Sequence, residues 1–330
     1  MKYPRIIIDL SKIEANARVA VEAGREHSIN IIGVTKACLG APEVGRAMLA
    51  GGVAGLSDSR VSNLRRLRSA GLPGQLMLLR LPMLSEVDDV VELADASLNT
   101  SPDVIERLGQ AAAVTGRRHG VIIMVETGDA REGVTPAGVA PLAVAAEMAD
   151  GVDFLGVGTN VACLTGCPPS AVNLELLAEA AHVAAETIGR PLAVVSGGNS
   201  SAWRLLREGG LPEEVNELRL GEAILLGRET AEGTHIPEMF EDAFLLEAEI
   251  IESLPGRNGH HIAALGLQDT AVDDLIPLDP GWQVVKGSSD HLVLRRDTDP
   301  SPIGSTIVFR PGYQSLLRAM TSPFVEKHYV

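Results

Sequence analysis

Lys36 follows an apolar run directly, and this position is suited to a reactive amine. In IIGVTKACLG (residues 31–40), β-branched side chains end at Thr35 and Lys36, and small residues follow. Because a lysine is among the costliest side chains to bury, Lys36 either marks the exit of a strand into water or holds a partly desolvated amine in a cleft. For a single lysine the first interpretation is the commoner, so the neighbouring motifs have to decide.

The stretch SGGNSS (residues 196–201) is a candidate anion site. Its glycines let the backbone approach an anion, the helix start that follows offers unpaired N–H groups, and Ser200 and Ser201 add hydroxyl donors. The alternative is an ordinary helix cap at Asn199 or Ser200. A second turn, RLGEAILLG (residues 219–227), can face the same anion. Two such turns across from a lysine form the layout that a pyridoxal phosphate enzyme needs, with a Schiff base on the lysine and the phosphate at the rim.

Arg219 bears on which reaction such a cofactor would support. One interpretation is an ion pair with Glu217 or Glu222. In the other, the guanidinium faces the pyridine nitrogen of the cofactor. Because arginine keeps its proton, that nitrogen would stay unprotonated and the ring would be a weaker electron sink. This favours simple reprotonation of the substrate's Cα, and therefore racemisation, over transamination.

Eight short β-branched runs alternate with helical patterns over most of the chain. The expected strands are 30–35, 54–57, 75–79, 96–99, 121–126, 154–158, 192–196 and 217–220, and helices are expected at 102–115, 137–149, 174–188 and 200–207. Another strand is expected at 5–8, followed by a helix that a capping box of Ser11 and Glu14 opens and that runs to about Glu26. Eight parallel strands close a barrel, and the polar segments after the strands then converge on one rim.

The pattern changes near residue 235. Strand-like runs at 243–251, 261–265, 282–285, 291–295 and 306–309 follow, separated by turns and without a long helical pattern. The sequence therefore predicts an α/β fold with two domains. Residues 1–235 form a (β/α)8 TIM-type barrel, residues 236–330 form a smaller mostly-β domain, and the strand at 5–8 is a candidate member of the second domain.

Composition narrows the class of partner. The net charge of −15, from 43 acidic and 28 basic residues, argues against nucleic acid and anionic lipid. No run of eighteen apolar residues and no secretory signal occurs, so we expect neither membrane insertion nor export. Three cysteines are present, Cys38, Cys163 and Cys167, an odd number without metal-ligand spacing. We therefore expect a reducing cytoplasm and no metal site.

A set of motifs spanning nearly the whole chain resembles one enzyme family. The motifs are YPRIIIDLSKIEAN (3–16), GVTKACLGAPE (33–43), LSDSRVSNLRRL (56–67), GVGTNVACL (156–164), SGGNSSAW (196–203), LRLGEAILLGRE (218–229), GSSDHLVL (287–294) and MTSPF (320–324). Together they resemble the alanine racemase-type, fold-type III pyridoxal phosphate enzymes, and more closely the ornithine/alanine racemase branch. The resemblance implies a two-domain protomer and a head-to-tail homodimer with shared active sites.

The resemblance also implies roles for individual residues. Lys36 resembles the Schiff-base lysine, and Arg219 resembles the partner of the pyridine nitrogen. The residues that resemble cofactor contacts are Asn160 and Asn199 beside the ring and phosphate, Ser200 and Ser201 through their donors, and Gly221 and Glu222 through their backbone. Arg131, in ETGDAREG, resembles the arginine that binds the substrate carboxylate, and Ser289 and Asp290 resemble a loop that enters the partner's site.

Four positions depart from the family pattern. The tyrosine just after the lysine is missing from KACLG, Met124 replaces a lysine that is often carbamylated, and Asn160 replaces a histidine. The tyrosine that serves as second base is replaced by Leu267, in LGLQDTAV. A two-base racemase needs a proton-transferring group on each face of Cα. The candidates are Asp269, His291 and Tyr313, each of which also has an ordinary structural explanation.

The predicted function is therefore an amino-acid racemase that acts on a larger or basic amino acid such as ornithine or lysine. An acidic rim of Asp58, Glu126 and Asp129 can pair with a distal ammonium group, although solvated surface charge explains it equally. One alternative is a lyase or decarboxylase with the same cofactor, because the second tyrosine is missing. Another is a non-catalytic pyridoxal phosphate carrier, against which the long C-terminal β domain argues.

Overall fold

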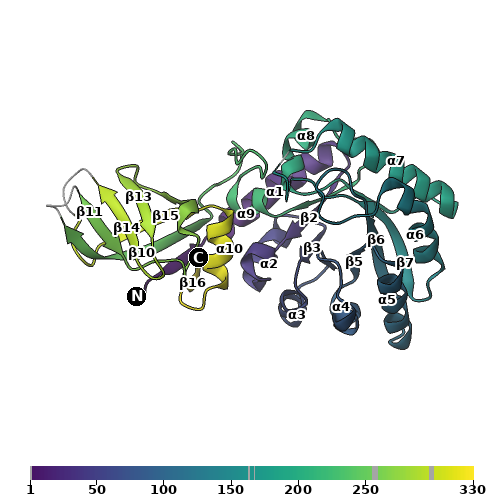
Figure 1. Ribbon diagram of the computed structural model, residues 1–330, viewed down its shortest axis with the longest axis horizontal. Helices are drawn as coiled ribbons and strands as arrows, with labels where there is room; N and C mark the ends of the chain where they lie inside the picture. The colour runs from purple at the N-terminus through teal and green to yellow at the C-terminus, as the bar shows by residue number, and fades with distance from the viewer. Residues whose placement is uncertain (1, 163, 167, 255–258, 297–300) are drawn as a thin grey trace.

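Eight parallel strands close into a barrel surrounded by helices. The computed structural model describes residues 2–162, 164–166, 168–254, 259–296 and 301–330, and shows the barrel beside a separate β-sheet (Figure 1). The barrel strands are β2 (Asn30–Val34), β3 (Gly55–Asp58), β4 (Gln75–Leu78), β5 (Ala96–Asn99), β6 (His119–Met124), β7 (Val152–Gly158), β8 (Val194–Ser196) and β9 (Glu217–Leu220). Each lies within a few residues of its predicted position.

The helices follow the strands around the outside of the barrel. They are α1 (Leu10–Glu26), α2 (Pro42–Ala50), α3 (Val61–Ser69), α4 (Val87–Leu93), α5 (Pro102–Val114), α6 (Pro136–Met148), α7 (Ala171–Ile188), α8 (Trp203–Glu208) and α9 (Glu222–Leu226). Their apolar faces pack on the strands in one extensive core. A second, smaller cluster of Met77, Ala96, Leu98, Ile122 and Met124 is built only from strand residues of the barrel.

The barrel closes between its last and first strands, β9 and β2. Ile32 pairs with Arg219, and Gly33 pairs with Leu220. β8 is the other neighbour of β9, through the pairing of Ser196 with Glu217. The turns after β8 and β9 therefore lie beside the strand that leads to Lys36. The prediction that they lie across the barrel from this lysine was wrong, because closing the barrel places its last strand beside its first.

The second sheet is antiparallel apart from one pair of strands. Its path is β12 (Leu275–Pro277), β15 (Thr306–Pro311), β10 (Phe244–Leu254), β11 (His260–Ala263), β14 (Leu292–Arg296) and β13 (Trp282–Gly287). β1 (Arg5–Ile8) pairs antiparallel with β10 and parallel with β16 (Glu326–Tyr329). The predicted fold class is confirmed, whereas the domain boundary at residue 235 stays a prediction.

One local expectation was wrong, and one short helix was not predicted. Helix α1 starts at Leu10, and its cap is Asp9, whose Oδ1 accepts from the backbone N–H groups of Ser11 (3.0 Å) and Lys12 (3.2 Å). Ser11 therefore lies inside the first turn, two positions after the cap. The C-terminal region also contains a helix, α10 (Tyr313–Thr321), which its short length concealed in the sequence.

Polar side chains join the barrel to the segment that leads into the sheet. The fully buried Asn16 of α1 donates from Nδ2 to the carbonyl oxygens of Ile224 (3.0 Å) and Phe240 (2.9 Å), and its Oδ1 accepts from the N–H of Phe240 (2.7 Å). Glu241 accepts from Arg228 after α9 (2.8 Å) and from Arg310 on β15 (2.5 Å). These contacts fix the sheet relative to α1 and α9 of the barrel.

We predict that Asn16→Ala lowers the free energy of unfolding by roughly 3 kcal/mol, because it leaves buried backbone groups without partners. Urea denaturation measures the change, and Gln110→Ala at an exposed position of α5 is the control. A loss no larger than that of the control would contradict the role of Asn16.

Candidate active site

The backbone before Lys36 is fixed by the neighbouring strand. Thr35 is fully buried, and its hydroxyl donates to Oδ2 of Asp58 at the end of β3 (2.8 Å). Asp58 also accepts from Asn63 Nδ2 (2.9 Å) and from the N–H of Arg60 (3.1 Å). Burial raises the pKa of this carboxyl group, while its hydrogen bonds lower it. Lys36 begins a short 3₁₀ helix, η1 (Lys36–Cys38), directly after this anchor.

Tyr313 lies over Lys36. The Lys36 Nζ atom is 5.6 Å from the centroid of the tyrosine ring, which belongs to the first residue of α10. Burial raises the pKa of the Tyr313 phenol, and the charge of Lys36 and a hydrogen bond with it lower that pKa. The C-terminal domain thus supplies a proton-bearing group to the barrel lysine of the same chain.

Asp274 holds the start of α10 in place. Its Oδ2 accepts from the N–H groups of Gln314 (2.9 Å) and Ser315 (3.1 Å), so it caps a helix whose own preceding residue, Gly312, has no side chain. A Cβ at Gly312 would lie 2.0 Å from Oδ1 of Asp274, which explains the glycine. Because Tyr313 is the first residue of this capped turn, Asp274 helps to place it at Lys36. No local pattern predicts this cap, since the two segments are far apart in the chain.

Arg219 is buried at the end of β9 and is held by its neighbours. It donates to Ser196 Oγ on β8 and to the carbonyl oxygen of Thr159 (2.6 Å). The Ser196 hydroxyl donates in turn to Oε1 of Glu217 (2.7 Å), whose pKa is raised by burial and lowered by the charge of Arg219. Arg219 and Glu217 are therefore linked through the hydroxyl of Ser196, a residue that the sequence did not single out for this role.

Backbone and hydroxyl donors converge at the turns after β8 and β9. The Ser200 Oγ atom accepts from the N–H groups of Gly221 (3.2 Å) and Ala223 (3.1 Å). These two N–H groups meet at one oxygen atom, and a phosphate oxygen can occupy the same kind of position. The arrangement fits a phosphate group next to Lys36.

Asn199 organises the turn after β8. Its Oδ1 accepts from the N–H of Ser201 (2.8 Å), so the ordinary cap that the sequence offered as an alternative is present. Its Nδ2 donates to Oδ1 of Asn160 (2.8 Å) and to the carbonyl oxygen of Val161 (2.9 Å), to which the Ser201 hydroxyl also donates (3.3 Å). Asn160 and Ser201 are therefore brought to the same place, between the ends of β7 and β8.

The other predicted residues form two further groups. Arg131 lies on the loop after β6, beside Glu132 and Asp129. In the C-terminal domain, Asp269 accepts from the N–H of Gly266 (2.8 Å), and this turn packs on the 288–291 loop through a hydrogen bond from Gln268 N–H to the Ser289 carbonyl oxygen (2.9 Å). Asp290 and His291 are exposed in that loop, and the Asp290 Oδ1 and His291 Nδ1 atoms are within hydrogen-bond distance (2.8 Å). One unit of the C-terminal domain thus contains four of the candidates, Asp269, Ser289, Asp290 and His291. The contact of Tyr313 with Lys36 is not part of this unit.

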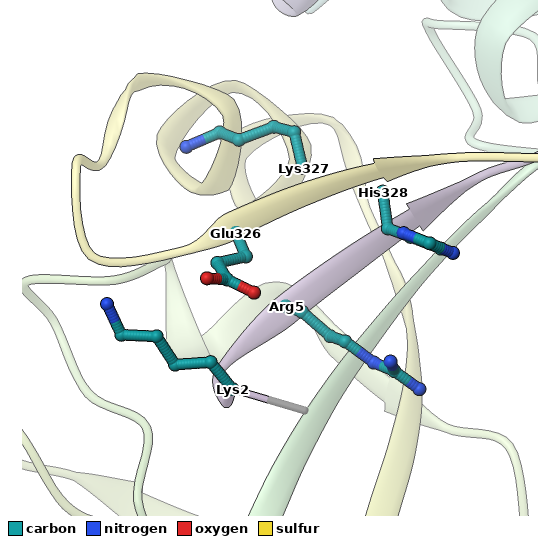
Figure 2. A pocket seen from close by; sticks show the side chains of 5 residues that line it. All are labelled: Lys2, Arg5, Glu326, Lys327 and His328. Atoms are coloured by element: carbon teal, nitrogen blue, oxygen red, sulfur yellow. The ribbon is translucent and has the colours of Figure 1, made fainter.

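A pocket of about 430 Å³ lies beside β1 and β16, away from the barrel rim. Figure 2 shows Glu326 between Lys2 and Arg5, and Lys327 directed to the other side of its strand. Arg5 also binds Glu247 on β10 (2.5 Å), and Lys327 donates to the carbonyl oxygens of Ser322 and Val325. Because the pocket is lined by residues of β1, β16 and the N-terminal segment and not by the residues at the barrel rim, it is not the candidate site.

Within the described residues, no three His, Cys, Asp or Glu side chains converge as metal ligands. Cys163 and Cys167 lie outside those residues, and Cys38 is buried with its pKa raised by burial. The part of the chain that the structure describes contains no helix long and apolar enough to cross a membrane.

Comparison with known proteins identifies the family. The model for the alanine racemase N-terminal domain matches residues 8–229. The chain belongs to the alanine racemase family. It is 38% identical to a lysine racemase of Thermotoga maritima, over 100% of this chain and 99% of that protein, and 35% identical to an ornithine racemase of Acetoanaerobium sticklandii, over 98% and 99%. The resemblance inferred from the motifs is confirmed.

The fold is shared more widely than the sequence. A D-threonine aldolase of Filomicrobium marinum superposes with a TM-score of 0.82 over 97% of this chain and 88% of that one, at 20% identity. This likeness shows the arrangement of barrel and sheet alone.

Glu222 makes the stability of the protein depend on pH. Burial raises the pKa of its carboxyl group from 4.5 to about 7, and the charges of Asp274 and Glu229 add to the rise, while a hydrogen bond with Thr230 opposes it. Because the folded state keeps a proton that the unfolded chain releases, the free energy of unfolding falls as the pH rises from about 4.5 to about 7.

We therefore predict that Glu222→Gln stabilises the protein relative to the parent at pH 8 more than at pH 5. Thermal unfolding at both pH values measures this, with Glu175→Gln at an exposed position of α7 as control. A difference in stability that stays constant with pH would contradict the buried, protonated state of Glu222.

Proposed function

We propose that this chain is a pyridoxal phosphate-dependent racemase of a basic amino acid such as lysine or ornithine. The observation that carries the proposal is the placement of Lys36 beside the donors of Ser200, Gly221 and Ala223, with Arg219 buried at the adjacent strand end. Two relatives named as racemases of lysine and ornithine, matched over nearly their full length, support the substrate class. The cysteine content suits the proposed cytoplasmic location.

The cofactor, when bound, supplies electron withdrawal that makes the Cα–H bond of the amino acid acidic. The donors at Ser200, Gly221 and Ala223 would hold its phosphate, and Asn160 and Asn199 would border it. Arg219 keeps its proton and presents a cation held by Ser196 and Thr159, so it does not release a proton to a ring nitrogen. The Lys36 amine removes or returns the Cα proton on its own face.

Tyr313 serves the same face as Lys36, because its phenol contacts that amine. The opposite face then needs a group from elsewhere. We propose a homodimer in which the unit of Asp269, Ser289, Asp290 and His291 of a second copy enters the site, with Asp269 and His291 as the candidates for the second base. The exposure of Asp290 and His291 leaves them available for this contact.

Fewer acidic side chains are available at the rim than the sequence suggested. Asp58 is fully buried and engaged by Thr35 and Asn63, so it acts in the protein's own structure. Asp129 is buried beside Arg131, so of the three predicted rim carboxylates only Glu126 remains, on the loop after β6. The distal ammonium group of a basic substrate would pair with Glu126 under this proposal.

We predict that the holoenzyme exchanges the Cα hydrogen of lysine or ornithine for deuterium and interconverts the two enantiomers. Mass spectrometry and chiral chromatography of all common L- and D-amino acids measure both. Loss of carbon from the substrate would instead indicate a lyase or decarboxylase, and binding without exchange would indicate a carrier; either result contradicts the proposed racemase.

We predict that Arg219→Glu increases transamination, measured as oxo acid formed per racemisation event, because a carboxyl group favours a protonated ring nitrogen. Arg219→Gln is the control, because it removes the cation without supplying an acid, and its transamination should rise less. An unchanged ratio in a folded Glu variant would remove the role given to Arg219.

A further inference from the structure

The loop after β6 contains a carboxylate whose place in the site is unexplained. The family's frequent lysine at the end of β6 is Met124 here, and Met124 packs in the apolar barrel cluster with Met77 and Ile122. No charge at position 124 can therefore act on Arg131. We infer that Asp129 is a positioning residue, which orients Arg131 toward the α-carboxylate of the substrate; this inference rests on the proposed function.

Asp129 ties two loops of the rim together. Its Oδ1 accepts from the N–H groups of Leu164 (2.9 Å) and Thr165 (3.4 Å), which belong to the loop after β7. The residue is 2% exposed, although it lies on a loop. Because one oxygen is fixed by the other loop, the direction of the second oxygen is fixed as well.

The second oxygen faces Arg131. Oδ2 of Asp129 is shielded from solvent and receives no hydrogen bond from the residues that the structure describes. The Nε atom of Arg131 lies 3.7 Å away. A buried carboxylate oxygen without a donor is costly unless a cation compensates it, so the electrostatic attraction between the two side chains accounts for the burial of Asp129.

The backbone between them is unusual. Ala130 has a φ of +54°, a left-handed conformation that residues with a Cβ rarely adopt. Such strain persists only where the surroundings enforce it, and it is common at functional sites. The turn at Ala130 lies between Asp129 and Arg131, and the ionic contact between these two side chains spans the turn.

Glu132 holds the guanidinium of Arg131 from another direction. It accepts from both Nε and Nη2 of the arginine. The Arg131 side chain is still 39% exposed, so a ligand from solution can reach it. Asp129 itself is not reachable, because its Oδ2 is shielded from solvent. Direct binding of a substrate ammonium group by Asp129 is therefore the weaker interpretation, and action through Arg131 is the stronger one.

The test compares two ligands that differ only in the carboxylate. Lysine and 1,5-diaminopentane are titrated into the holoenzyme by calorimetry, for the parent and for Asp129→Asn, Arg131→Lys and the double variant. Asparagine keeps an oxygen for Leu164 and Thr165 but removes the negative charge. Asp103→Asn, at an exposed position in the first turn of α5, is the matched control.

We expect Asp129→Asn to weaken lysine binding by about tenfold, as is typical when a supporting contact of a ligand-binding side chain is lost. Diaminopentane binding should stay unchanged, and the double variant should bind lysine no more weakly than Arg131→Lys. Equal weakening of both ligands, or no change in either, would overturn the role of Asp129.

Hydrogen exchange separates the positioning role from a loss of structure. Amides 164–166 should remain protected in Asp129→Asn and lose protection in Asp129→Ala. Loss of protection in both variants would reduce Asp129 to a loop anchor and overturn the inference. A parent protein that binds lysine more tightly than the diamine but does not exchange its Cα hydrogen would refute the proposed function and leave the inference standing. A parent that binds both equally would refute the inference.

Discussion

The pairing of β9 with β2 is the interaction on which the candidate site depends. It closes the barrel, and in doing so it brings Arg219 and the amide of Gly221 next to the strand that leads to Lys36. Groups that are distant in the chain thereby share one rim: the amine of Lys36, the guanidinium of Arg219 and the N–H donors of Gly221 and Ala223. Because the register of a barrel strand cannot shift by one residue without turning its side chains to the other face, this closure also fixes which side chains face the site.

Buried polar groups on both sides of this closure are compensated by one another. Thr35 donates to Asp58 before Lys36, and Ser196 links Arg219 to Glu217. Such networks stabilise a single arrangement when every member has a partner, and they are costly when one member is removed. The rigidity of the rim therefore comes from side-chain pairs that cross between adjacent strands, while the helices outside supply the apolar core.

Most of the fold could be predicted from the sequence, because the patterns that indicate strands and helices are local. Each barrel strand was a short apolar run with a polar end, and Lys36, Ser200 and Arg219 stood at such ends. The contacts that organise the site are not local. The approach of Tyr313 to Lys36 and the cap of α10 by Asp274 join segments whose separation in the chain gives no spacing to read. The relation of Asp129 to Arg131 was concealed for a different reason. The two residues are only two positions apart in the sequence, but burial alone shows that a carboxylate oxygen of Asp129 depends on Arg131.

The central claim is that the amine of Lys36 bonds covalently to the aldehyde of a pyridoxal phosphate cofactor. Reducing the purified holoenzyme with borohydride and mapping its peptides by mass spectrometry tests this claim directly. The account predicts that the phosphopyridoxyl group is found on Lys36, in the peptide that contains Thr35 and Cys38. A reduced cofactor on another lysine, or on none in protein supplied with pyridoxal phosphate, would contradict it.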